Sequence, residues 1–195
     1  MMRAVIGAAA ALAMATAAHA GEWVLDGDAS HLAYGSIKLG MIGEVNSFSG
    51  LSGKVSPDGA VSVEIDLSSV DTLVDIRNER MREFVFKNAP QAELTAKVDM
   101  GKLEALSDGD VDVLPVDGTL SFLGKEVDVS TDMVVARLTD ERVMVSTNDM
   151  VFVNTATLGI DAGVDKLKEL AKLPSIERTV PVTMRLVFTA AKPNT

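Results

Sequence analysis

The chain has 195 residues, no cysteine and a formal net charge of −10 at pH 7. This length suits one domain with its own core, and the lack of cysteine excludes disulfides and thiol chemistry. Because so acidic a surface repels phosphate groups, we exclude general nucleic-acid binding.

The first twenty residues have the composition of a secretory signal peptide. Arg3 is the only charged residue before an alanine-rich apolar run, and Ala18-His19-Ala20 has the small-x-small pattern that signal peptidases cut. We therefore expect residues 1–20 to be removed and residues 21–195 to form the mature domain. Its location is then a bacterial periplasm or the exterior. No later apolar run is long enough to cross a membrane.

The segments after residue 21 alternate apolar and polar residues with a period of two. In 61–67, for example, Val61, Val63, Ile65 and Leu67 share one face. This pattern predicts strands that are buried on one face and solvated on the other, as in antiparallel sheets. The alternation recurs in 94–100, 116–122, 127–130, 143–145 and 182–186. Roughly eight or nine strands are expected.

Two segments depart from this alternation. Residues 71–87 mix apolar and charged side chains, which predicts a short amphipathic helix after a loop. Residues 161–173 predict a clearer helix with one apolar face, Asp161 as its cap and Pro174 beyond its end. The sequence therefore predicts a mainly β domain with two short helical insertions.

A large sheet that is apolar on one face has to bury that face, either against a second sheet or by closing on itself. Closure removes exposed edge strands. We therefore favour a single closed antiparallel barrel of about eight strands over a sandwich.

Several stretches, spread over most of the chain after residue 20, carry a resemblance to a known family. They are Trp23-Val24-Leu25-Asp26 with Ser30-His31-Leu32-Ala33-Tyr34, then 43–50, Ser69-Val70-Asp71-Thr72 with Arg77-Asn78 and Phe84-Val85-Phe86, 118–127, Asn154 and 174–182. In order and spacing the chain resembles the YceI-like proteins. The resemblance implies an exported bacterial protein with a lipocalin-like barrel, associated with polyisoprenoid lipids. One departure is that Arg77-Asn78 stands where the family usually has Arg-Asp, which puts an ion pair there in doubt.

The inward face of such a barrel is either filled by side chains or encloses a small ligand. Alternation alone favours a dry core, whereas the resemblance implies a cavity that holds an isoprenoid tail. The predicted apolar lining is Tyr34, Val63, Ile65, Leu67, Phe84, Leu94, Val98, Leu120, Phe122, Val129, Met133, Met184 and Leu186. Methionine suits an irregular apolar guest because it is flexible and polarisable.

Arginines are concentrated in the segment 77–82 of this acidic chain. Arg77 and Arg80 are candidate contacts for a polar or anionic headgroup, because guanidinium offers forked donors. The alternative is a solvated helix face on which these arginines pair with Glu79 and Glu83.

The sequence carries no catalytic or metal signature. His31 is the only histidine after residue 20, and one histidine without cysteine does not make a closed structural zinc site. There is no nucleophile elbow, P-loop or dinucleotide fingerprint. We therefore expect no metal, no cofactor and no catalysis.

These observations lead to the hypothesis of a periplasmic carrier that sequesters a polyisoprenoid or an isoprenoid quinone in its barrel. The lipid is then a ligand rather than a cofactor, and a homodimer is left open. Two alternatives stand beside this hypothesis. One is a ligand-free barrel acting as a protein-interaction or stress-related envelope module. The other is an isomerase or hydrolase that uses a cavity carboxylate with a strongly shifted pKa.

Overall fold

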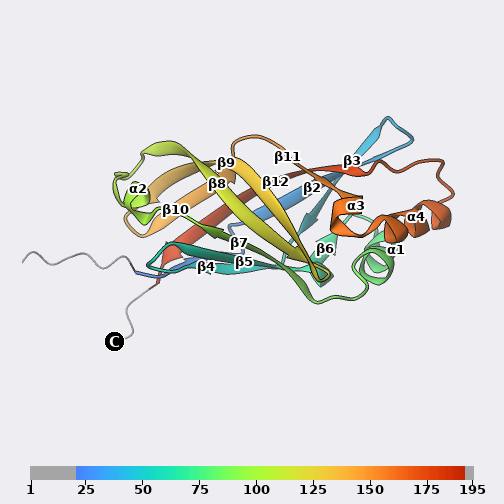
Figure 1. Ribbon diagram of the computed structural model, residues 1–195, viewed down its shortest axis with the longest axis horizontal. Helices are drawn as coiled ribbons and strands as arrows, with labels where there is room; N and C mark the ends of the chain where they lie inside the picture. Colours follow the sequence, from blue (N-terminus) through green and yellow to red (C-terminus); the bar gives the residue numbers. More distant parts are fainter. Residues whose placement is uncertain (1–20, 192–195) are drawn as a thin grey trace, which may run out of the picture.

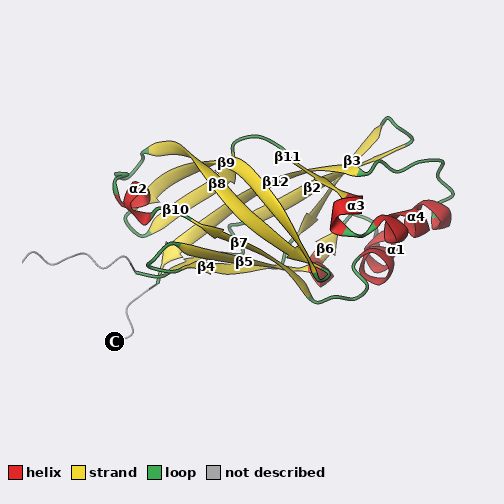
Figure 2. Ribbon diagram, in the orientation of Figure 1, coloured by secondary structure: helices red, strands yellow, loops and turns green. Residues whose placement is uncertain are grey.

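Antiparallel strands dominate the computed structural model, which describes residues 21–191 (Figures 1 and 2). The strands are β1 (Trp23–Leu25), β2 (His31–Lys38), β3 (Ile42–Phe48), β4 (Leu51–Val55), β5 (Ala60–Asp66), β6 (Val70–Asp71), β7 (Gln91–Lys97), β8 (Val111–Phe122), β9 (Lys125–Thr139), β10 (Arg142–Thr147), β11 (Val151–Asn154) and β12 (Thr179–Ala190). The helices are the 3-10 turn η1 (Leu67–Ser69), α1 (Asp75–Arg80), the π-helical η2 (Met81–Val85), α2 (Met100–Glu104), α3 (Thr155–Leu158) and α4 (Asp161–Leu170).

The strands close into an eight-stranded barrel. Hydrogen-bonded neighbours follow the order β1-β4-β5-β7-β8-β9-β10-β12, and β1 pairs again with β12, for example Leu25 with Phe188. On one edge of the long strand β12 lie β1 and then β2; on the other lie β10 and then β11. This confirms the prediction of a mainly β protein with a closed antiparallel barrel.

One half of the barrel is filled by inward side chains. We call it the filled half, and its buried residues include Trp23, Val55, Val135, Val143, Leu186 and Phe188. Helix α2 lies at this end, on the left in Figure 1. The guanidinium carbon of Arg137 lies 5.5 Å from the centroid of the Trp23 ring, a cation–π distance.

Four helical segments, α1, η2, α3 and α4, gather at the other end, on the right in Figure 1. Helix α4 packs closely on η2 because Gly163 has no side chain. A Cβ atom built at Gly163 would lie only 2.4 Å from the Phe84 carbonyl oxygen. These helices close the end of the barrel opposite the filled half.

The helices differ from the prediction in two respects. The expected single helix within 71–87 is α1 followed by a π-helical turn, in which the Phe86 amide donates to the Met81 carbonyl at 2.9 Å. Asp161 is not the cap of α4 but its first residue; Ile160 occupies the N-cap position. The Asp161 carboxylate instead accepts a hydrogen bond from the hydroxyl of Thr155 in α3.

Helices α2 and α3 were not predicted. The expected strand 94–100 ends at Lys97, because the Asp99 carboxylate accepts the Gly101 amide and starts α2. Asn154 starts α3 in the same way, and Gly159 ends it in the left-handed region at φ 74°. Within residues 21–191, no helix has the length and apolar character needed to span a membrane.

Candidate functional site

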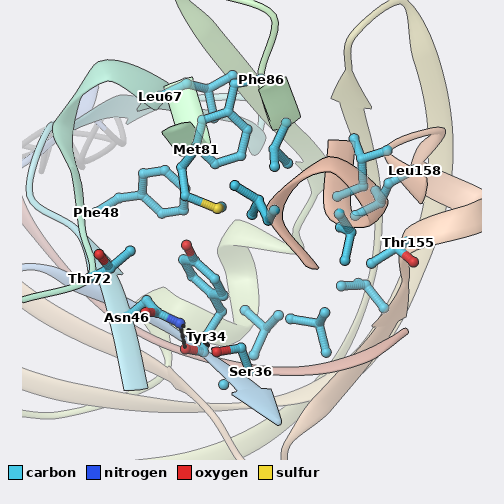
Figure 3. A pocket seen from close by; sticks show the side chains of 18 of the residues that line it. Tyr34, Ser36, Asn46, Phe48, Leu67, Thr72, Met81, Phe86, Thr155 and Leu158 are labelled. Atoms are coloured by element: carbon cyan, nitrogen blue, oxygen red, sulfur yellow. Dashed lines mark hydrogen bonds between the residues drawn. The ribbon is translucent and has the colours of Figure 1, made fainter. Parts of the chain in front are cut away.

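A cavity of about 520 Å³ occupies the half of the barrel beneath α1, η2, α3 and α4 (Figure 3). We call this the cavity half. Its size lies within the usual range of small-molecule sites. The wall is formed by inward residues of the strands, and the cover by Met81, Val85, Leu158, Ile160, Val164 and Leu167 from the helical end. A cavity so lined is suited to an apolar guest.

Aromatic side chains run along the cavity wall. The rings of Tyr34 and Phe48 have centroids 5.6 Å apart, Phe48 and Phe86 are 5.8 Å apart, and Phe86 meets Phe122 edge-on at 6.1 Å. They come from β2, β3, the end of η2 and β8. These contacts fix the rings at the wall, so they leave the centre of the cavity half open.

The structure brings eight of the thirteen predicted lining residues to the cavity. These are Tyr34, Ile65, Leu67, Leu94, Leu120, Phe122, Val129 and Met184. Seven of them lie on strands, whose alternation turns them inward, and Leu67 is the first residue of the turn η1. Their role in binding a ligand stays a prediction.

The other five predicted residues do not line the cavity, and here the prediction is corrected. Val63, Met133 and Leu186 are buried, but they lie beyond the cavity. Val98 lies at the end of β7, beside α2 and remote from the cavity, where its amide donates to the Gly59 carbonyl. Period-two alternation sets the face of a strand but not the position along the barrel at which the interior is filled.

Phe84 is misplaced for a different reason. It lies on the π-helical turn η2, from which Met81 and Val85 line the cavity. Phe84 is half-buried and absent from that lining. Met81 and Val85, four residues apart on this turn, face the cavity together, whereas Phe84 is directed away from it.

A charged cluster lies in the cavity wall at the start of β3. The Lys38 ammonium is 2.8 Å from one oxygen of Glu44, and the Arg77 guanidinium is 2.5 Å from the other. Arg77 also donates to the Thr72 carbonyl at 2.9 Å. The hydrogen bond from Lys38, followed by the hydrogen bond and the charge of Arg77, holds the pKa of Glu44 below its usual range. Glu44 is therefore an ionised partner rather than a neutral acid.

This cluster separates the two predicted headgroup residues. Arg77 is engaged with Glu44, so it pairs with neither Glu79 nor Glu83. Arg80 lines the cavity, and its guanidinium makes no hydrogen bond or ion pair with another residue of the described range. Arg80 therefore has the freer guanidinium, and contact of either arginine with a headgroup remains a prediction.

Asn78 takes part in the same loop without a charge. Its side-chain oxygen accepts both the Thr72 amide at 2.8 Å and the Thr72 hydroxyl at 2.6 Å. Thr72 is buried, and its carbonyl in turn holds Arg77. The amide oxygen of Asn78 therefore anchors the loop.

Several buried polar atoms at the cavity have no hydrogen-bond partner in the structure: the Tyr34 hydroxyl, the Asn46 side-chain oxygen and the Arg77 Nε. Burial raises the pKa of Tyr34 well above its usual value, although the Arg77 charge opposes this, so the phenol stays protonated. Figure 3 shows its hydroxyl pointing into the cavity. Orphaned donors and acceptors of this kind call for a partner.

Sequence reasoning missed part of the lining. Leu32, Ser36 and Phe48 share strand faces with Tyr34 and Asn46, so strand parity alone could have found them. No pattern in the sequence indicated which residues of the helical segments cover the cavity. Within residues 21–191, no group of three histidine, aspartate or glutamate side chains is placed to hold a metal ion.

Comparison with known proteins confirms the resemblance to the YceI-like proteins. The sequence matches the model of the YceI-like domain family across residues 23–188. Among curated proteins no match was found. A solved polyisoprenoid binding domain from Saccharophagus degradans, implicated in plant cell wall breakdown, is 34% identical with a TM-score of 0.85. The match covers 87% of this chain and 98% of that domain.

A second solved structure, BcnA from Burkholderia cenocepacia, is 19% identical with a TM-score of 0.63. The match covers 84% of this chain and 98% of BcnA. At this identity the likeness concerns the barrel fold alone.

Proposed function

Because the chain belongs to the YceI-like domain family, we propose that the protein binds and carries an apolar chain inside its barrel. The ligand class we propose is a polyisoprenoid or an isoprenoid quinone. The observation that carries this proposal is the apolar cavity of about 520 Å³ in the cavity half. The 34% identical relative described as a polyisoprenoid binding domain supports the same ligand class.

The affinity of such a site would come from removing the ligand's apolar surface from water. Each buried methylene contributes about 0.8 kcal/mol, so a five-carbon isoprene unit contributes about 4 kcal/mol. Lost freedom of the ligand and ordering of side chains offset about 4–15 kcal/mol of this gain. Tight binding therefore requires several units of the chain to enter the cavity.

We propose that binding involves no chemical step. Among the residues that the structure describes, two carboxylates line the cavity, Glu44 and Glu177, and Glu44 is held ionised by Lys38 and Arg77. A general acid would need a raised pKa, and Glu44 has a lowered one. A carrier needs only a cavity surface that matches its ligand and a path by which the ligand enters and leaves.

A polar end of the ligand would meet polar groups of the cavity wall. The unpartnered Tyr34 hydroxyl can donate a hydrogen bond to a carbonyl or ether oxygen of the ligand. Arg80 offers a cation for an anionic end. An isoprenoid quinone would use the tyrosine, and an isoprenoid phosphate would use the arginine.

The proposed location is the periplasm or the exterior. It rests on the signal-peptide pattern of residues 1–20, which lie outside the described residues. A carrier in an aqueous compartment shields an isoprenoid from water between two membranes or two enzymes.

Mass spectrometry of an organic extract tests the proposal. The full chain is expressed in a bacterium and the exported protein is purified without detergent. We expect an isoprenoid in stoichiometric amount. Tyr34→Phe should lower the recovery of a quinone, whereas Arg80→Gln should lower that of a phosphate. Absence of lipid from the purified protein, together with no uptake of added isoprenoid quinone or isoprenoid phosphate, would contradict the proposal.

A further inference from the structure

Large apolar side chains are exposed in two segments beside the cavity. The tip of the β2–β3 hairpin exposes Leu39, Met41 and Ile42, and Val45 follows on β3. The second segment, at the start of α1, exposes Leu73, Val74 and Ile76. Met41 is 82% exposed and Leu73 is 84% exposed. We call these seven residues the rim.

The two segments of the rim belong to one end of the barrel. Antiparallel pairing of Ser47 with Asp71 directs the chain after β6 back along β3, toward Val45. The ion pair between Arg77 and Glu44 joins the two segments directly. Figure 1 shows the hairpin extending past the barrel at the end where α1 and α4 lie.

The rim is continuous with the cavity. Val74 and Ile76 are both exposed to solvent and part of the cavity lining. Lys38, the last residue of β2 before the hairpin tip, also lines the cavity. An apolar molecule that leaves the cavity past Val74 and Ile76 therefore meets the rim first.

The stability of the fold does not explain why the residues of the rim are apolar. Leu39 and Leu73 have φ values of 57° and 61°, in the left-handed region that leucine rarely adopts. The side chain of Leu73 gains almost no burial in return, and that of Leu39 stays 38% exposed. Clustered exposed apolar residues usually mark a surface that binds an apolar partner.

The charge of the rim region favours a lipid surface as that partner. Segments 38–45 and 71–82 carry four basic and four acidic residues, so they are neutral while the whole chain has a net charge of −10. The charged residues are Lys38, Arg77, Arg80, Arg82, Glu44, Asp71, Asp75 and Glu79. The rim is thus a face that meets a bilayer without net repulsion, and the rest of the acidic surface stays in water.

We propose that the rim docks on a lipid bilayer and inserts its exposed side chains, Met41 and Leu73 foremost, among the lipids. The cavity then opens toward the membrane, and an isoprenoid moves between the two without crossing water. The transfer of an isoprenoid rests on the proposed function, whereas docking on the bilayer is measured without any ligand in the cavity. Attraction to lipid headgroup charge is not required.

Flotation with phosphatidylcholine vesicles tests the proposal. Protein purified from expression of the full chain should float with the vesicles, and raising the salt from about 0.1 M to about 1 M should not release it. Met41→Asp combined with Leu73→Asp should lower the vesicle-bound fraction at least tenfold. The control is Val111→Asp on β8, because Val111 is 61% exposed and lies outside the rim. It should leave flotation unchanged.

A second variant separates docking from folding. Leu39→Asn combined with Leu73→Asn places a residue that tolerates left-handed backbone at both positions. It should fold at least as stably as the natural chain and still float at least tenfold less. Vesicle binding that persists in both rim variants would overturn the proposal, and so would a natural chain that does not float. If lipid is extracted from the purified protein but the protein does not float with vesicles, only the docking proposal is overturned. If the protein floats but never takes up isoprenoid, only the proposed carrier function is overturned.

Discussion

The filled half and the cavity half share long strands such as β5 and β12 but hold different interiors. On β5, Val63 is buried outside the cavity, and Ile65, two residues on, lines it. On β12 the same boundary lies between Leu186 and Met184. Apolar side chains thus continue along one inward face from a dry core into a cavity wall.

The difference shows that filling depends on the side chains that meet from opposite walls. In the filled half, the guanidinium of Arg137 on β9 lies 5.5 Å from the ring centroid of Trp23 on β1, and these two strands are not hydrogen-bonded neighbours. In the cavity half the aromatic rings contact one another along the wall. Helices close that half at its end without filling it.

The largest effect expected of this contrast is on stability. Leu186→Ala in the filled half should lower the free energy of unfolding by about 2–5 kcal/mol, because it removes contacts and leaves a void. Leu120→Ala in the cavity wall should cost less than about 2 kcal/mol, since the side chain already borders open space. Denaturant titration measures both. Equal losses in the free energy of unfolding for the two variants would mean that the two halves are packed alike.

The second expected effect uses two valines of one strand. Val135→Phe should over-pack the filled half and lower the free energy of unfolding by about 1–3 kcal/mol. Val129→Phe should be accommodated by the cavity, with a change below about 1 kcal/mol, and should reduce the lipid recovered by extraction. A Val129→Phe protein that is as unstable as Val135→Phe would argue against open space beside β9.

A third, smaller effect concerns pH and Glu44. Because Lys38 and Arg77 lower the pKa of folded Glu44, its carboxylate stabilises the fold above its unfolded pKa. That contribution is lost as the pH falls through the lowered, folded pKa. Glu44→Gln should therefore be less stable than the natural chain near ~pH 7, and the gap should close toward ~pH 3. Denaturant midpoints at several pH values measure it; a gap that stays constant would contradict the assignment.

The smallest effect is expected at the opposite end of the barrel. Lys97 and Asp58 form an ion pair of 2.7 Å, and the hydrogen bond from Lys97, followed by that from Ser56, lowers the pKa of Asp58 to about 2. Both members of the pair are well exposed to solvent. Asp58→Asn should therefore leave the thermal midpoint unchanged within error. A clear loss of stability would show that this exposed pair matters more than the partly buried cluster at Glu44.

The sequence predicted the fold well where strands alternate over several residues. Alternation in 61–67 and 182–186 corresponds to β5 and β12, and the closed barrel follows from the need to bury one face of a long sheet. The short helices were harder. Helix α3 has only four residues, which is too short for any helical period to be visible.

The site was predicted less completely than the fold. Strand parity selected lining residues such as Ile65 and Leu120, but it also selected Val63 and Leu186 beyond the cavity. The ion pair of Arg77 with Glu44 joins residues of α1 and β3 that no local pattern connects. Contacts of this kind depend on the closed barrel, so they become visible only in three dimensions.

A crystal structure of the protein purified without added lipid or detergent tests the central claim most directly. We predict elongated electron density in the cavity half, running from the Tyr34 hydroxyl toward α4, with no comparable density in the filled half. A cavity half occupied by ordered water alone, or one collapsed so that α4 and η2 fill the barrel, would contradict the account.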